Sequence, residues 1–137
     1  KLMFAYGEAT VPKVTVTLRK SYGGAHDVMS CKQLRGDFNY AWPTAQIAVM
    51  GAKGAIEVLY GKEVAAITDP EAKAKFIAEK DEEYNHAFAN PYKAASYGYI
   101  DDVIEPRNTR FRVIRAFQSL QTKRVTNPMK KHSNIPL

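Results

Sequence analysis

The amino-acid sequence predicts an α/β fold built around two similar strand–glycine–helix units. In the first unit, the β-branched residues 11–18 read as a strand that leads to Gly23 and Gly24 and then to a short helical pattern. In the second, residues 45–50 form a short apolar strand before the small residues 51–55 and another helical pattern. Units of this kind place helices against a parallel sheet. With 137 residues, 45% of them hydrophobic, the chain is long enough for one packed core.

The remaining elements follow from turn and capping residues. Residues 1–9 read as the end of a helix, and residues 37–43 as a short strand or loop that ends at a proline. Asp69 and Pro70 predict a helix start, because Asp caps the first turn and Pro suits the first helical position. This helix is expected to run to about residue 89, and Phe76, Ile77, Tyr84, Ala87 and Phe88 share one of its faces.

Three further segments complete the chain. Asn90 and Pro91 begin a shorter helix that ends at Gly98, and residues 99–104 read as a strand. Pro106 begins a last helix to about residue 123, with an expected inward face of Val113, Ile114, Phe117 and Leu120. Residues 126–137 contain two prolines and little periodicity, which predicts an extended tail packed on a neighbour.

The net charge of +6 is concentrated near the C-terminus. No acidic residue follows Glu105, whereas eight of the 20 lysines and arginines do. Residues 1–105 therefore carry twelve basic and fourteen acidic side chains, a net charge of −2. Such a basic segment suits nucleic acid, an acidic protein surface or a phosphorylated ligand, but no nucleic-acid motif accompanies it. We expect no nucleic-acid binding.

Cysteine and histidine usage argues against a metal centre and against internal disulfides. Cys31 is the single cysteine, which fits a reducing compartment. His26, His86 and His132 lie too far apart and in too different contexts to form a local metal site, so we expect no metal in this chain. No apolar run reaches the roughly 18 residues of a membrane span, and no secretory signal is present.

The glycine pair is the strongest candidate site. A strand that ends at Gly23 and Gly24 before a helix leaves the first helical N–H groups unpaired, and the missing side chains let a ligand oxygen approach them. Such a turn can stabilise developing negative charge as an oxyanion hole. The alternative is a tight turn that needs glycine for its backbone angles. Asp27 is either a ligand neighbour or a carboxylate that complements the helix dipole on the first turn.

Two long motifs carry a family resemblance. The segments RKSYGGAHDVM (residues 19–29) and DFNYAWPTAQIAVMGAKGA (residues 37–55) resemble the carboxyltransferase (β) subunits of biotin-dependent acyl-CoA carboxylases, of the propionyl-CoA carboxylase type. FANP (residues 88–91), GYIDDVI (residues 98–104) and KKHSNIPL (residues 130–137) are similar to the C-terminal end of the same family. The departures are few: His26 stands where relatives often have Tyr, and Met129 where they often have Trp.

The resemblance implies a fold and a reaction. The fold would be crotonase-like (ClpP/crotonase), and residues 1–137 would be the C-terminal part of the carboxyltransferase C-terminal domain, the last quarter or so of a longer subunit. The enzyme would transfer the carboxyl group of carboxybiotin, held on a separate carrier domain, to the α-carbon of a short-chain acyl-CoA, propionyl-CoA first. The amides of Gly24 and Ala25 would be the catalytic, biotin-side oxyanion donors. Tyr22, Gly23 and Asp27 would bind substrate, Asp27 by lining the acyl pocket.

The implied partners are acyl-CoA, a biotin carboxylase and biotin carrier subunit, the N-terminal carboxyltransferase domain of another subunit, and further copies in a homo-oligomer. The isolated chain is expected to be inactive. The expected location is the bacterial cytoplasm, with the mitochondrial matrix as the alternative. Two other functions remain open: a subunit of a biotin-dependent sodium-pump decarboxylase of the methylmalonyl-CoA type, and a non-catalytic oligomerisation fragment.

Overall fold

The computed structural model describes residues 1–127. The helices are α1 (Leu2–Glu8), α2 (Gly23–Val28), α3 (Ala52–Ala66), α4 (Pro70–Ala87), α5 (Pro91–Ser96) and α6 (Thr109–Ser119), with 3-10 turns η1 (Lys32–Leu34) and η2 (Pro106–Asn108). The strands are β1 (Val14–Thr17), β2 (Lys20–Tyr22), β3 (Phe38–Ala41), β4 (Gln46–Ala48) and β5 (Asp102–Val103).

The strands form two small parallel sheets. One sheet has the order β1-β3-β5, and the other pairs β2 with β4. The chain passes from β1 in the first sheet to β2 in the second, and repeats this step from β3 to β4, so the two units predicted from the sequence lie side by side. The predicted α/β class is confirmed.

Two apolar clusters hold these layers together. Ala41, Ile47 and Ile100 are buried where α5 packs on the strands. Tyr40, Ile104 and Ala116 are buried between the three-stranded sheet and α6, with Val14 and Val16 against them. The alternation of β1 therefore places its valines on the α6 side of the sheet.

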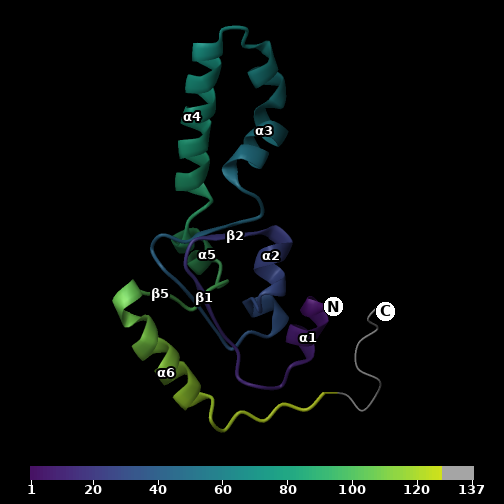
Figure 1. Ribbon diagram of the computed structural model, residues 1–137, viewed down its shortest axis with the longest axis vertical. Helices are drawn as coiled ribbons and strands as arrows, with labels where there is room; N and C mark the ends of the chain where they lie inside the picture. The colour runs from purple at the N-terminus through teal and green to yellow at the C-terminus, as the bar shows by residue number, and fades with distance from the viewer. Residues whose placement is uncertain (128–137) are drawn as a thin grey trace.

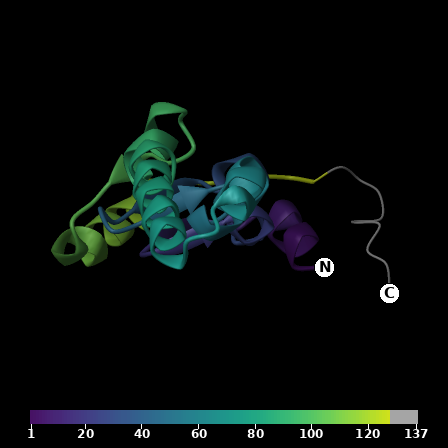
Figure 2. The same ribbon diagram turned by 90° about the horizontal axis from the view of Figure 1, so that it is seen from above.

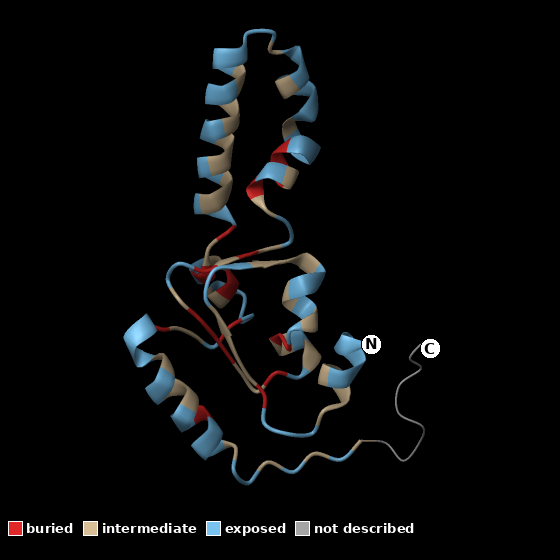
Figure 3. Ribbon diagram, viewed as in Figure 1, coloured by how far each residue is buried: buried red, intermediate tan, exposed pale blue. Residues whose placement is uncertain are grey.

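Helices α3 and α4 form an antiparallel hairpin that projects away from the sheets (Figure 1). The predicted start of α4 is confirmed, because the Asp69 carboxylate accepts the backbone N–H groups of Glu71 and Ala72. Buried residues of the hairpin gather at its base, on α3, and the tip is exposed (Figure 3). Of the residues predicted to share one face of α4, Phe76, Ile77 and Tyr84 are half-buried, whereas Ala87 and Phe88 are exposed.

The inward face predicted for α6 is confirmed only in part, at Val113 and Leu120, which are half-buried. Ala116 is buried and Val113 is half-buried, but Ile114 and Phe117 are each 44% exposed, so the predicted burial of these two side chains is wrong. Beyond α6 the chain is extended and runs back toward α1, as Figures 1 and 2 show. The amide of Asn127 donates to the carbonyl of Glu8 there. The predicted tail at residues 128–137 lies outside the described residues.

Some boundaries differ from the sequence prediction for local reasons. The strand predicted over residues 11–18 is shorter, as β1, and a separate strand that was not predicted, β2, forms at residues 20–22 because they pair with β4. Residues 52–55 were expected in a second turn but belong to α3, with Gly51 as its N-cap. The predicted strand at residues 99–104 shortens to β5, because pairing with β3 covers only the positions opposite Tyr40 and Ala41.

Candidate active site at the glycine helix

Gly23 is the point where β2 turns into α2. Its φ is +50°, a left-handed backbone conformation that residues other than glycine rarely adopt. A Cβ atom at this position would lie 2.8 Å from the carbonyl oxygen of Val49, at the end of β4. The paired strands β2 and β4 therefore fix where the helix begins, and glycine is required there for both reasons.

The first turn of α2 presents open backbone. The first N–H groups of any helix have no partner within the helix, and in α2 these include the amides of Gly24 and Ala25. Both residues are exposed, and a Cβ at Gly24 would meet no atom of the described chain within 4 Å. Ala25 is the third helical residue. The two amides that the sequence predicted as oxyanion donors thus lie next to each other on an accessible turn.

A hollow of about 740 Å³ opens beside this turn; we call it the glycine hollow. Gly23, Gly24 and Asp27 are part of its wall. Most of the rest is apolar or aromatic and comes from β4 and from the helices α3, α4 and α5 with the loop after α5: Ile47, Ala48, Val49, Leu59, Phe88, Ala94, Tyr97 and Tyr99. An apolar hollow with a few polar groups on one wall is the usual form of a small-molecule site.

Asp27 and His26 add the polar chemistry of this wall. Asp27 is exposed and lies on the second turn of α2, not on the first turn where the sequence placed it. His26 lies with its Nδ1 3.0 Å from the Ser21 hydroxyl oxygen. Burial lowers the pKa of His26, and the nearby Asp27 carboxylate offsets part of that effect. Burial therefore favours the neutral form of the imidazole.

Tyr22 is the predicted site residue that the structure places elsewhere. Its hydroxyl donates to the Gln46 side-chain oxygen at 2.6 Å, and its ring lies against Gly51, where an added Cβ would be 3.2 Å from the ring. Burial raises the pKa of the Tyr22 hydroxyl, and Tyr84 and Asp81 act in the same direction. Neither Tyr22 nor Ala25 is among the described residues that form the wall of the glycine hollow.

Several wall residues gave no signal in the sequence. Leu59 and Tyr97 are 64% and 61% exposed, and Phe88 is 54% exposed. In the sequence, the spacing of Phe88 predicts only that it shares a helix face with other apolar residues. Lys93 supplies a cation to the same hollow and lies 5.0 Å from the centre of the Tyr97 ring. These residues come together through the fold, so local sequence patterns could not have identified them.

The comparison with known families agrees with the motifs on both sides of the glycine turn. Residues 1–135 match the model of the carboxyl transferase domain. The chain belongs to this family. Over all 137 residues it is 63% identical to the propionyl-CoA carboxylase beta chain of Cereibacter sphaeroides, and over 136 residues it is 52% identical to the methylmalonyl-CoA carboxyltransferase 12S subunit of Propionibacterium freudenreichii subsp. shermanii. The chain spans 26% and 25% of the length of these two relatives.

Solved structures of carboxyl transferases share the fold. A crystal structure of transcarboxylase 12S, described as a hexamer with methylmalonyl-CoA and methylmalonic acid bound, superposes with a TM-score of 0.87 at 51% identity. It is covered over 26% of its chain, and this chain over 99%. The beta subunit of Pseudomonas aeruginosa geranyl-CoA carboxylase, 24% identical, superposes with a TM-score of 0.70. The predicted crotonase-like fold is confirmed.

Two kinds of feature are absent from the described residues. Between residues 1 and 127, no three His, Cys, Asp or Glu side chains are grouped so that they could hold a metal ion. In the same part of the chain, no helix combines the length and apolar character needed to cross a membrane.

Proposed function

We propose that residues 1–137 are the C-terminal part of a carboxyltransferase C-terminal domain, and that the complete subunit transfers a carboxyl group from carboxybiotin to the α-carbon of a short-chain acyl-CoA. Propionyl-CoA is the first candidate, because the relative that is 63% identical is a propionyl-CoA carboxylase beta chain. The proposal thus includes a short acyl chain and transfer in the direction from biotin to the acyl-CoA.

The observation that carries this function is the pair of open amides beside an apolar hollow. When carboxybiotin is bound, it supplies the carboxyl group that is transferred. The N–H groups of Gly24 and Ala25 would donate to the ureido oxygen on the biotin side, where negative charge develops. The walls of the glycine hollow fit a flat, mostly apolar ring system with one carbonyl oxygen, because apolar side chains surround the one open backbone segment.

Asp27 would serve the acyl side of the same reaction. It lies in the wall of the glycine hollow, three residues beyond Gly24 and exposed. A carboxylate there keeps water or a polar partner, because stripping an ion of solvent costs several kcal/mol. Its presence favours short acyl groups, which leave room for that water. Tyr22 would act indirectly, by supporting β2 through its bond to Gln46.

The proposed partners follow from the incomplete character of this site. Carboxyl transfer needs the acyl-CoA to be held against the donor, and oxyanion donors alone do not provide that orientation. We assign this task to the N-terminal carboxyltransferase domain of another subunit in a homo-oligomer; transcarboxylase 12S is described as a hexamer. A biotin carboxylase and biotin carrier subunit would deliver carboxybiotin. Residues 1–137 alone would be inactive, and the complete enzyme would work in the bacterial cytoplasm or, alternatively, the mitochondrial matrix.

A second function has its own support. The chain is 51% identical over 137 residues to the methylmalonyl-CoA decarboxylase subunit alpha of Propionigenium modestum. The same oxyanion donors would serve a transfer in the opposite direction, from a malonyl-type thioester to biotin, because both directions pass through the same charge distribution. Two assays distinguish these functions. One measures carboxylation of acetyl-, propionyl- and butyryl-CoA, and the other measures decarboxylation of methylmalonyl-CoA.

The test of the proposed function is Ala25→Pro in the complete subunit, assayed with its biotin carrier. Proline removes one N–H, and losing one oxyanion donor typically lowers kcat by roughly 10²- to 10³-fold. Proline is tolerated in the first helical turn, and Gly24 before it has no Cβ to clash, so the fold should be kept. Ala25→Ser is the matched control, since it changes the same exposed position and retains the N–H. A folded Ala25→Pro subunit with the same rate as Ala25→Ser would contradict the assignment.

A further inference from the structure

Helix α2 has little of its own to hold it in place. It contains six residues, and none of them is buried by the part of the chain that the structure describes. Within the same residues, its N-cap Tyr22 makes no side-chain capping bond. Isolated helices this short are not stable in water, because nucleation costs more than one or two turns return. Apart from the contact between His26 and the Ser21 hydroxyl, the position of the Gly24 and Ala25 amides is therefore set by contacts at the ends of α2.

The C-terminal end of α2 is bound to two neighbouring strands. The Thr15 hydroxyl on β1 lies 3.2 Å from the carbonyl oxygen of Met29 and 3.1 Å from that of Ser30. The Asn39 side-chain amide on β3 donates to the same Ser30 carbonyl at 3.1 Å. Thr15 and Asn39 are opposite each other in the register of β1 and β3. Two side chains of the sheet thus meet at the peptide that follows α2.

The chain at this point is held in an unusual conformation. Ser30 is 3% exposed and has a φ of 66°, in the left-handed region that residues other than glycine seldom occupy. Gly36 approaches it so closely that an added Cβ would lie 2.5 Å from the Ser30 carbonyl oxygen and 3.0 Å from the Asn39 Nδ2 atom. A strained backbone conformation persists only where neighbouring residues hold it in place. Here Thr15 and Asn39 bind the Ser30 carbonyl and Gly36 lies close to it.

Asn39 is itself fixed on both sides. It is 4% exposed, its backbone N–H donates to the Asp101 carboxylate at 2.7 Å, and its carbonyl accepts the N–H of Asp101 at 2.7 Å. The other carboxylate oxygen of Asp101 lies 2.7 Å from Nζ of Lys32, on η1. Asp101 therefore ties both the anchoring strand and the turn after α2 to one point of the sheet.

We propose that Thr15 and Asn39 are positioning residues for the Gly24 and Ala25 amides: by binding the Met29 and Ser30 carbonyls, they fix α2 on the sheet. The catalytic part of this inference rests on the function proposed above. Loss of this anchoring would lower the rate of carboxyl transfer by shifting the two amides. A misplacement of about 1 Å can lower a rate by roughly 10²-fold, even when the substitution is distant.

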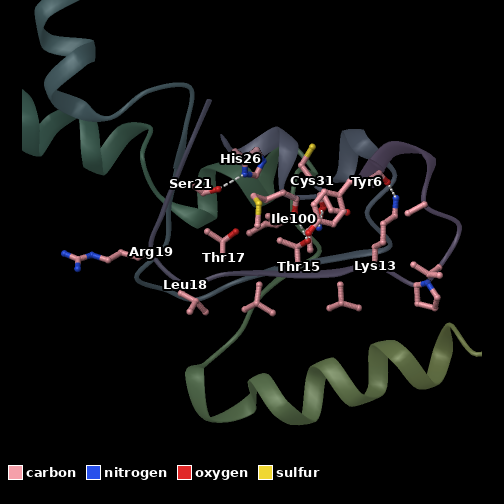
Figure 4. A pocket seen from close by; sticks show the side chains of 18 of the residues that line it. Tyr6, Lys13, Thr15, Thr17, Leu18, Arg19, Ser21, His26, Cys31 and Ile100 are labelled. Carbon is pink, nitrogen blue, oxygen red and sulfur yellow. Dashed lines mark hydrogen bonds between the residues drawn. The ribbon is translucent and has the colours of Figure 1, made fainter. Parts of the chain in front are cut away.

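The structure offers a matched pair of threonines for the test. Thr15 and Thr17 lie on the same side of β1, facing His26 and Cys31, whereas Leu18 points the other way toward α6 (Figure 4). Thr15→Val removes the two hydroxyl contacts and keeps the side-chain shape. Thr17→Val makes the same chemical change two residues away, where the hydroxyl has no hydrogen-bond partner among residues 1–127. Thr15→Ser restores the hydroxyl.

The experiment compares these variants in the complete subunit by hydrogen exchange and by steady-state kinetics. Thr15→Val should raise amide exchange in a peptide covering residues 27–31 and lower kcat about 10-fold or more, with the KM for acyl-CoA unchanged. Thr17→Val and Thr15→Ser should behave like the wild type in both measurements. Asn39→Asp, which places a carboxylate oxygen against the Ser30 carbonyl, should raise the same local exchange, and provides a second variant if Thr15→Val expresses poorly.

The two readouts separate this inference from the proposed function. Unchanged exchange at residues 27–31 in both Thr15→Val and Asn39→Asp would overturn the anchoring. Raised exchange with an unchanged kcat would uphold the anchoring and refute the catalytic role of the α2 amides. A lower melting temperature with unchanged local exchange and unchanged kcat would mark both residues as purely structural and would also overturn the inference.

Discussion

Gly23 and Gly24 are adjacent, yet the structure predicts that replacing each by alanine changes the free energy of unfolding in opposite directions. At Gly23 the φ of +50° and the 2.8 Å approach to the Val49 carbonyl oxygen both exclude a side chain. At Gly24 a Cβ would meet no atom of the described residues within 4 Å, and α2 continues through this position. The Gly-Gly pattern by itself gave no reason to expect different effects on stability at the two positions.

The magnitudes follow from these two environments. A left-handed conformation at a residue other than glycine costs on the order of 1–3 kcal/mol, so Gly23→Ala should lower the free energy of unfolding by at least that amount. The Val49 contact adds to this cost, because the atom in the way belongs to the backbone of a paired strand end and cannot rotate aside. Gly24→Ala should instead raise the free energy of unfolding by roughly 0.4–1 kcal/mol, since alanine restricts the unfolded chain more than glycine does.

Activity should fall in both variants, for different reasons. In Gly24→Ala the new methyl group lies where a ligand oxygen would have to approach the amide, so kcat should drop by about 10²-fold although the fold is more stable. Urea unfolding and steady-state carboxyl transfer by the complete subunit measure the two effects. A Gly24→Ala subunit with wild-type turnover would refute the close approach of a ligand oxygen, and a Gly23→Ala subunit with wild-type stability would refute the backbone constraint.

Two further predictions concern carboxylates. Asp27→Leu should shift kcat/KM toward longer acyl chains by roughly 1–3 kcal/mol per methylene accommodated, measured with acetyl-, propionyl- and butyryl-CoA; an unchanged ranking would show that Asp27 does not reach the acyl group. Burial alone would raise the pKa of Asp37, but hydrogen bonds from Lys123 and from the Lys13 backbone, with the charges of both lysines, outweigh burial and lower it below 3.8. The stabilisation is therefore present above pH 3.8 and is lost as the pH falls through the folded-state value, so the acid-induced loss of stability in urea titrations should be smaller in Asp37→Asn than in the wild type.

The parts of the fold that the sequence predicted are those determined by neighbouring residues. Asp69 and Pro70 specify a helix start within four residues, and the capping bonds form as expected. Asn90 caps α5 in the same way, by accepting the N–H of Lys93. The glycine turn is also local, because backbone geometry and unpaired amides at a helix start depend on a few adjacent residues. The candidate oxyanion donors could be predicted from the sequence for this reason.

The parts that the sequence did not predict depend on tertiary packing. Ile114 and Phe117 fit an apolar face of α6 by spacing, yet Ala116 is the residue that α6 buries against Tyr40 and Ile104. A helical period identifies which residues share a face, but the neighbouring strands determine which face is covered. The same limit applies to the glycine hollow, whose aromatic side chains come from residues 84–99, at least 60 residues along the chain from Gly24.

Thr15 and Thr17 illustrate this limit at its smallest scale. Both are threonines on one face of one strand, and their sequence context is nearly identical, Val-Thr-Val-Thr. Thr15 lies opposite Asn39 and beneath the end of α2, where two carbonyl groups need donors, while Thr17 lies opposite Ala41, which has no polar side chain to offer. The pairing of β1 with β3, 24 residues apart, thus decides which threonine holds the helix and which does not. The hydroxyl at residue 15 therefore matters to the site because of strand register, and the hydroxyl that residue 17 already carries cannot replace it.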